Sequence, residues 1–309
     1  MFASQFLIQN RPFEEALTAH IEWISGHGRG RKCEFGSVTL NDIELREVDL
    51  RGASFDGTTL LDADLSGANL TGAAIQAADF SRALLTGTDL TGARIVGSQF
   101  PECFMSGIVM AETKIEECSF RRSQMRAARF QDAVLSKIAF SITDLTGASF
   151  HHAKLNDCDL SSARVDDVQF FRTQLDNCRC IGMAGAAANF SRAKLKQCDF
   201  SKAELPFAIF GHARLEVICC IKAVLTGADF REATLTGSDF SGAVLRNARM
   251  GGANLFTANF SGADLTGVRD LTQQQLSQTR TDGSTVLPNG TRGPYTRYSG
   301  AERCPNQGA

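Results

Sequence analysis

The chain has 309 residues, with 34 acidic and 32 basic side chains and a formal net charge of −2. This balance excludes a global electrostatic attraction to nucleic acid or to an anionic membrane surface. No apolar run approaches the length of about 18 residues that a membrane-spanning helix needs, so no transmembrane segment is expected.

The first predicted element is an amphipathic helix over residues 12–25. Apolar residues recur there at helical spacing, Pro12 suits a first helical turn, and Gly26 can end the helix. We expect this helix to cap the fold within an N-terminal segment, 1–32. The N-terminus has no basic region followed by an apolar run, so no secretory signal is expected and the predicted location is the cytoplasm.

A five-residue period dominates residues 33–269. In the register that starts at Phe35, every fifth residue is Leu, Phe, Ile, Met or Val, except at Cys180, Gly185 and Cys220. A second inward-facing class, small and mostly Ala, lies two residues before each large residue. Because a period of 5 fits neither the helical period of 3.6 nor the strand period of 2, each unit is predicted to be a short extended piece and a corner.

The phenylalanines indicate how many units close one coil. Between residues 80 and 260, every Phe in this register falls on a multiple of ten, and other residues fill the positions between them. Coils of four units place these rings on two opposite walls, where like side chains stack. The sequence therefore predicts one elongated solenoid domain of about 12 coils with 20 residues each.

Units such as Ala-Asp-Leu-Ser-Gly (63 to 67) and Ala-Asp-Leu-Thr-Gly (263 to 267) resemble those of the pentapeptide-repeat proteins of bacteria. The resemblance implies an all-β fold, a right-handed quadrilateral β-helix. It implies no single function, because the family includes many proteins whose activity the repeat does not reveal. Some members, the quinolone-resistance proteins, resemble a DNA rod in size and charge and bind DNA gyrase.

The spacing of three cysteines predicts a sulfur ladder. Cys158, Cys178 and Cys198 occupy the small inward position at intervals of 20 residues and should stack on one inner wall. Neighbouring coils lie within disulfide range, and sulfur clusters can bind soft metals, so oxidation and metal binding stay open. The favoured interpretation is that these thiols serve as small apolar residues in a reducing compartment.

The three lapses in the register coincide with a change in the outer surface. At Gly185 the large position is empty, and Met183 fills the small position instead, which roughly conserves volume. Outward positions near the lapses become apolar, and a contiguous patch of this kind would mark an interaction site. The residues of this candidate interaction patch are Phe171, Ile181, Phe207, Ile209, Val217 and Ile221.

The register is lost at Asp270, where a second capping segment, 270–288, is predicted. Thr272 and Gln275 have the spacing of a capping box, so we expect a short helix over 273–279. Gly, Pro, Thr and Arg dominate after this segment, and residues 289–309 are expected to form a disordered tail unless bound.

No catalytic constellation emerges from the sequence. The histidine pair His151 and His152 follows an inward position and faces outward, and no phosphate-binding loop is present. We therefore expect a non-catalytic interaction or scaffold protein without cofactor or metal, whose partner is another protein, with self-association left open.

One alternative is a DNA mimic that binds a topoisomerase such as gyrase, although the acidic excess is confined to residues 35–100. A hydrolase or metalloenzyme on a β-helix is the third possibility.

Overall fold

The structure is a computed structural model that describes residues 7–9, 11–26 and 28–303. It divides into two compact units, Met1–Ser149 (unit 1) and Phe150–Ala309 (unit 2). In a solenoid each turn contacts only the turns beside it, so no central core joins distant turns. No helix in the described part of the chain is long and apolar enough to cross a membrane.

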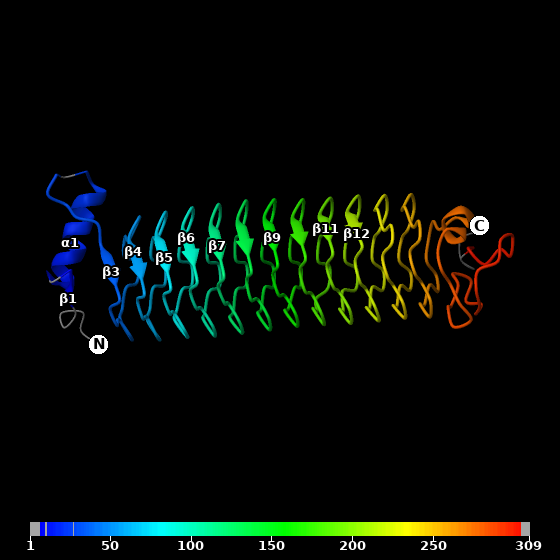
Figure 1. Ribbon diagram of the computed structural model, residues 1–309, viewed down its shortest axis with the longest axis horizontal. Helices are drawn as coiled ribbons and strands as arrows, with labels where there is room; N and C mark the ends of the chain where they lie inside the picture. Colours follow the sequence, from blue (N-terminus) through cyan, green and yellow to red (C-terminus); the bar gives the residue numbers. More distant parts are fainter. Residues whose placement is uncertain (1–6, 10, 27, 304–309) are drawn as a thin grey trace. The chain divides into compact units, whose positions relative to one another are not determined.

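The repeats of unit 1 form a parallel β-solenoid, in which each strand pairs with the strand 20 residues later (Figure 1). Phe35 lies beside Phe55, and Ile75 lies beside Ile95. We call the wall that carries these strands the strand wall. Its strands in unit 1 are β3 (Glu34–Gly36), β4 (Ser54–Asp56), β5 (Ala74–Gln76), β6 (Arg94–Val96), β7 (Lys114–Glu116) and β8 (Val134–Ser136).

Three further walls complete each turn. Parallel bridges join residues 20 apart at Thr39, Glu44 and Asp49, which follow one another at five-residue intervals in the first turn. Together with the strand wall, they give four sides to a turn of 20 residues. This four-sided turn is the one that the spacing of the phenylalanines predicts.

Unit 2 is built as the same kind of solenoid. Its strands on the strand wall are β9 (Lys154–Asn156), β10 (Gln174–Asp176), β11 (Lys194–Lys196) and β12 (Arg214–Glu216). After β12 the wall continues as single bridges, from Arg214 to Thr234 and from Thr234 to Asn254. Strands thus mark six turns in unit 1 and four in unit 2, slightly fewer than the 12 coils expected, because the last turns are joined there by bridges alone.

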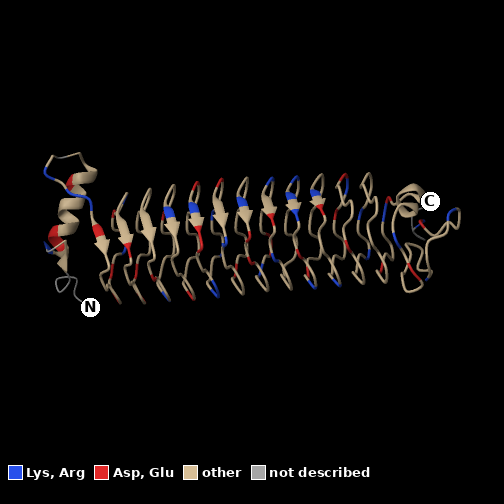
Figure 2. Cartoon of the chain, in the orientation of Figure 1, with Lys and Arg blue, Asp and Glu red and all other residues tan. Residues whose placement is uncertain are grey.

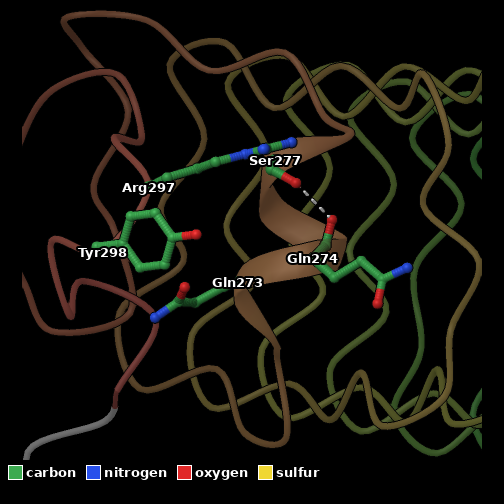
Figure 3. Close-up of a pocket in the computed structure, with 5 residues that line it drawn as sticks. All are labelled: Gln273, Gln274, Ser277, Arg297 and Tyr298. Atoms are coloured by element: carbon green, nitrogen blue, oxygen red, sulfur yellow. Dashed lines mark hydrogen bonds between the residues drawn. The ribbon is translucent and has the colours of Figure 1, made fainter.

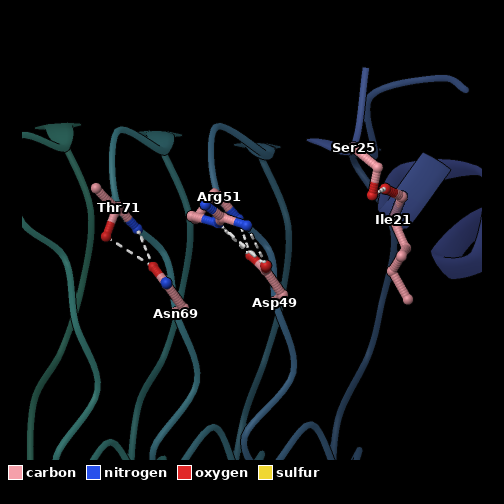
Figure 4. Close-up of polar contacts among 6 residues, drawn as sticks. All are labelled: Ile21, Ser25, Asp49, Arg51, Asn69 and Thr71. Atoms are coloured by element: carbon pink, nitrogen blue, oxygen red, sulfur yellow. Dashed lines mark hydrogen bonds and ion pairs between the residues drawn. The ribbon is translucent and has the colours of Figure 1, made fainter. Parts of the chain in front are cut away.

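The Asp or Asn that often precedes the large residue fastens the corner that follows it. Oδ1 of Asn69 accepts hydrogen bonds from the backbone N–H and the hydroxyl of Thr71, at 3.0 and 2.7 Å, as Figure 4 shows. Asp49 accepts from the backbone N–H of Arg51 at 3.2 Å and also pairs with its guanidinium. This is the local turn that Asx side chains favour, and it explains the polar member of the repeat.

The second residue of each corner adopts the left-handed backbone conformation whatever its type. Gly52 has a φ of 70°, but Arg172 and Phe207 have φ values of 56° and 60° at equivalent corners. Glycine adopts this conformation without steric cost, which accounts for its frequency there. The frame nevertheless imposes the conformation on other residues, whose side chains then lie on the outside.

Stacked phenylalanine rings form the core of both units. In unit 1 the ring centroids of Phe80 and Phe100 lie 4.8 Å apart, and the rings are nearly parallel. In unit 2 Phe190 stacks between Phe170 and Phe210 at 4.7 and 4.9 Å and meets the edge of Phe200 at 5.9 Å. The predicted ladders on opposite walls are therefore present, and they touch across the interior.

The N-terminal cap consists of an antiparallel strand pair and one helix. Strands β1 (Leu7–Ile8) and β2 (Arg11–Pro12) precede helix α1 (Phe13–Ile24), at whose end the Ser25 hydroxyl donates to the carbonyl of Ile21 at 2.8 Å (Figure 4). The helix lies close to the predicted range 12–25. Residues 1–6, which belong to the predicted capping segment, lie outside the described residues.

A buried histidine joins this helix to the first repeat. Nδ1 of His20 accepts the backbone N–H of Cys33 at 3.1 Å, and the imidazole stacks on Trp23 at 5.5 Å. Nε2 is buried and has no hydrogen-bond partner among the described residues. Burial lowers the pKa of His20 below its usual 6.5, because a charged ring would lose its hydration there.

We expect the N-terminal cap to loosen as the pH falls through about 6.5. Above this pH both the folded and the unfolded chain carry a neutral His20, whereas below it the unfolded chain takes up a proton that the folded cap resists. Hydrogen–deuterium exchange in α1, corrected for intrinsic rates, should show easier opening at about pH 5.5 than at about pH 7.5. A His212→Gln control should keep this response, and an opening free energy that does not change with pH would contradict the expectation.

The C-terminal flank contains helix α2 (Gln273–Ser277), within the predicted range 273–279. The capping box is formed: Gln275 N–H donates to the Thr272 hydroxyl at 3.2 Å, and Thr272 N–H donates to Gln275 Oε1 at 2.8 Å. The Gln275 amide also donates to the carbonyls of Met250 and Ala253, both at 2.9 Å. The Gln275 side chain thus caps the N-terminus of the helix and donates hydrogen bonds to backbone carbonyls of the last turns.

The expectation of a disordered tail over 289–309 is wrong for residues 289–303, which fold back in a series of turns. Gly293 N–H donates to the Thr285 carbonyl at 3.1 Å, and the carboxylate of the nearly buried Glu302 accepts from Gln273 at 3.1 Å. Polar hydrogen bonds and tight glycine turns order this segment, although it has few apolar residues. Residues 304–309 lie outside the described residues.

Candidate interaction surfaces

The six residues of the candidate interaction patch do not form one contiguous surface. Residues 20 apart occupy the same position in successive turns, so the register assigns each of the six residues to a corner or a wall of unit 2. Phe171 follows the wall of Phe170, and Val217 follows the strand wall. Ile181 and Ile221 share a third corner, two turns apart, with Ser201 between them. These four residues are therefore dispersed around the solenoid.

Phe207 and Ile209 lie two residues apart in the sequence, at a corner and on the wall that follows it. Phe207 occupies the corner that leads into the wall of Ile209, and their exposed fractions are 62% and 37%. The Phe207 ring lies over Gly227, where an added Cβ would be 2.7 Å from ring atom Cδ1. Glycine at 227 therefore leaves room for the ring against the next turn, while most of the side chain stays exposed.

A surface hollow of about 510 Å³ adjoins Ile209. Ile209 lines it together with Gly211, and Asp229, Arg231 and Glu232 contribute its charged side. The Arg231 guanidinium binds the Asp229 carboxylate at 2.6 Å, and this hydrogen bond lowers the pKa of Asp229. We call Phe207, Ile209 and this hollow the apolar site.

A second hollow, of about 390 Å³, lies along the strand wall of unit 2. Lys and Arg recur on β9, β11 and β12 in Figure 2, and Lys154 of β9 and Lys194 of β11 line this hollow. We call it the basic groove; its lining residues are His152, Lys154, Arg172, Gln174, Arg192 and Lys194. Sequence analysis missed it because the cations are dispersed along the chain, and only grouping the residues at intervals of 20 brings them together.

A third hollow, of about 280 Å³, lies at the C-terminal flank between α2 and the folded tail (Figure 3). Arg297 and Tyr298 face Gln273 and Gln274 across it, and the Ser277 hydroxyl donates to the Gln274 carbonyl at 2.9 Å. Its lining offers amides, hydroxyls and one guanidinium. Such groups can bind a polar surface, but they include no imidazole, thiol or carboxylate for acid–base chemistry.

The predicted sulfur ladder is present in unit 2, and its three cysteines are buried. Cys178 interacts with the thiols of both Cys158 and Cys198, and hydrogen bonding with Cys158 together with burial raises its pKa far above the usual value. A protonated thiol is a poor nucleophile and a poor metal ligand. No group of three or more His, Cys, Asp or Glu that could hold a metal occurs among the described residues.

Two family models match the sequence over most of its length. The model described as "Pentapeptide repeats" matches residues 33–72, 43–81, 68–107, 186–216, 223–262 and 239–273. The model described as "Pentapeptide repeat region" matches residues 93–170. The chain belongs to the pentapeptide-repeat family. Neither of the two models describes an enzyme.

Solved pentapeptide-repeat structures include distant relatives of this pentapeptide-repeat protein. HetL, involved in heterocyst differentiation regulation in the cyanobacterium Nostoc sp. strain PCC 7120, is 22% identical over 88% of this chain and 98% of its own, with a TM-score of 0.32. QnrB1, a plasmid-mediated fluoroquinolone resistance protein, is 18% identical over 81% of this chain and 93% of its own, with a TM-score of 0.28. A thylakoid lumen protein of Arabidopsis thaliana is 31% identical over 34% of this chain and 72% of its own, with a TM-score of 0.30.

These TM-scores are too low for any functional statement to be transferred from these proteins to this chain. No curated protein matches the sequence.

Proposed function

We propose that this pentapeptide-repeat protein is a non-catalytic scaffold that binds a protein partner at the apolar site. The observation that carries the proposal is the exposed Phe207 ring, 62% accessible, together with Ile209, which lies two residues later and lines a hollow. Aromatic side chains next to a pocket are typical anchors of protein interfaces. The Asp229–Arg231 ion pair and Glu232 supply a polar rim on one side of the hollow.

The rigid frame under this site supports a binding role. Phe207 and Ile209 flank Ala208, which is fully buried, and the backbone N–H of Phe207 donates to the Thr226 carbonyl at 2.8 Å. Their side chains are therefore presented from a fixed backbone, so that little backbone entropy is lost on binding. A partner that inserts an apolar side chain between Phe207 and the hollow would bury both residues.

The variant Phe207→Ser with Ile209→Ser should lose the partner while the fold stays intact. The partner is first identified by cross-linking and affinity capture with the wild-type protein, and binding of the purified partner is then measured by calorimetry. Removing two anchors should weaken binding by at least about tenfold. Val217→Ser is a matched control, because Val217 is 65% exposed in the same unit but lies at another corner.

Circular dichroism should show unchanged secondary structure for both variants. Equal affinity of the double variant and the wild type would contradict the apolar site. A loss of affinity in Val217→Ser alone would move the interface to the other corner. Sedimentation of the wild-type protein shows whether the partner is a second copy of this chain.

Imitation of duplex DNA is the less favoured alternative. In the acidic part of unit 1, Asp49 pairs with Arg51 at 2.7 Å and Asp62 pairs with Arg82 at 2.6 Å. A guanidinium beside a carboxylate reduces the negative potential that a DNA mimic needs. We therefore favour the scaffold, and a gyrase supercoiling assay without inhibition is the expected result.

A further inference from the structure

We propose that the basic groove of unit 2 binds a ligand that carries several phosphoryl groups in a row, such as a nucleoside triphosphate or a short inorganic polyphosphate. The groove lies on the strand wall, and its volume of about 390 Å³ is that of a small-molecule site. This inference does not rest on the scaffold function, because the two sites share no residue.

Two columns of cations build the groove. Arg172 and Arg192 occupy corners in the left-handed conformation, with φ values of 56° and 58°, and lie 20 residues apart. Lys154 and Lys194 occupy the exposed first positions of β9 and β11, and Gln174 of β10 is the Cα partner of both. Because paired strands lie about 4.8 Å apart, the cations extend over about 10 Å, which suits a row of phosphates better than a single one.

The lysines and arginines of the groove form no ion pair with a carboxylate in the described part of the chain. No ion pair is found for Lys154, Arg172, Arg192 or Lys194 among the described residues, and no Asp or Glu lines the groove. Elsewhere in unit 2, Arg246 binds Asp264 at 2.6 Å. Cations without a partner carboxylate produce a local positive potential that attracts a multivalent anion, although the chain as a whole is weakly acidic.

Phe171 holds one of these cations in place. The guanidinium carbon of Arg172 lies over the Phe171 ring, 5.2 Å from its centroid. The ring itself contacts His151 and His152, at centroid distances of 5.9 and 6.4 Å. A guanidinium stacked on an aromatic face keeps its N–H groups directed outward, where they can bind phosphate oxygens in pairs. Phe171 is therefore a positioning residue of the groove rather than part of an apolar patch.

Titration calorimetry of the full chain with inorganic tripolyphosphate tests this inference. Arg172→Gln with Arg192→Gln should weaken binding by at least about tenfold, and the wild-type affinity should fall as salt rises. Lys114→Gln is the matched control, because Lys114 occupies the first position of β7 on the strand wall of unit 1. Orthophosphate should bind at least about tenfold more weakly than tripolyphosphate.

The role of Phe171 has its own readout. Phe171→Ala should weaken tripolyphosphate binding by about threefold, and Phe171→Tyr, which keeps the ring, should restore it. Absence of tripolyphosphate binding, or equal affinity of the double arginine variant and the wild type, would overturn the proposal. Tighter binding of a single-stranded oligonucleotide with the same number of phosphates would overturn it too, by assigning the groove to nucleic acid.

Discussion

Replacing Phe190 by Ala should lower the free energy of unfolding by about 3–5 kcal/mol. The side chain is fully buried and lies between two stacked rings, at centroid distances of 4.7 and 4.9 Å, with a third ring edge-on at 5.9 Å. The frame of hydrogen-bonded turns cannot collapse around the vacated space, because each wall is held in register by its neighbours. A cavity should therefore remain, and its cost adds to the lost burial.

Urea denaturation followed by circular dichroism measures this loss. Phe256→Ala is the matched control, since Phe256 is 55% exposed in the same unit, and its effect should stay within about 0.5 kcal/mol. A Phe190→Ala midpoint equal to that of the wild type would show that the stacked rings contribute little to stability.

Replacing Gly185 by Ala should destabilise the protein by about 1–3 kcal/mol, although the change adds a single methyl group. A Cβ at this position would lie 2.4 Å from both the backbone N of Asp166 and the carbonyl carbon of Val165. Backbone atoms cannot move aside as a flexible side chain can, so the two turns would have to separate. The nearby Met183 is fully buried.

Gly211→Ala is the control for this prediction. A Cβ at Gly211 would meet only the Arg231 carbonyl oxygen, at 3.8 Å, and neither glycine has a positive φ. The two substitutions therefore differ mainly in available space. Thermal unfolding of the two variants should separate them, and equal midpoints would contradict the close approach at Gly185.

The sequence predicted those features that depend on spacing alone. The register of large residues specified the inward positions, the phenylalanines specified turns of 20 residues, and Thr272 with Gln275 specified the capping box. Each of these is a local or periodic rule, in which one residue type has one role.

The candidate sites depended on relations that the order of residues conceals. Phe171 and Phe207 were both predicted to be apolar side chains that face outward, but they lie at different corners. The Phe171 ring contacts the Arg172 guanidinium. Arg172 and Arg192 become neighbours only after a complete turn. Residues 289–303 were misjudged because hydrogen bonds to Thr285 and Gln273, rather than apolar burial, fix them.

The left-handed corner has a consequence for how such a surface diverges between lineages. Gly52, Arg172 and Phe207 share nearly the same backbone angle, so a substitution at a corner changes the exposed chemistry without changing the frame. Mutations there can accumulate one turn at a time while the ladder of inward residues stays under selection for packing. Two homologues can therefore keep superimposable backbones and recognise unrelated molecules. A comparison of the corner residues that lie 20 apart says more about what each homologue binds than overall sequence identity does.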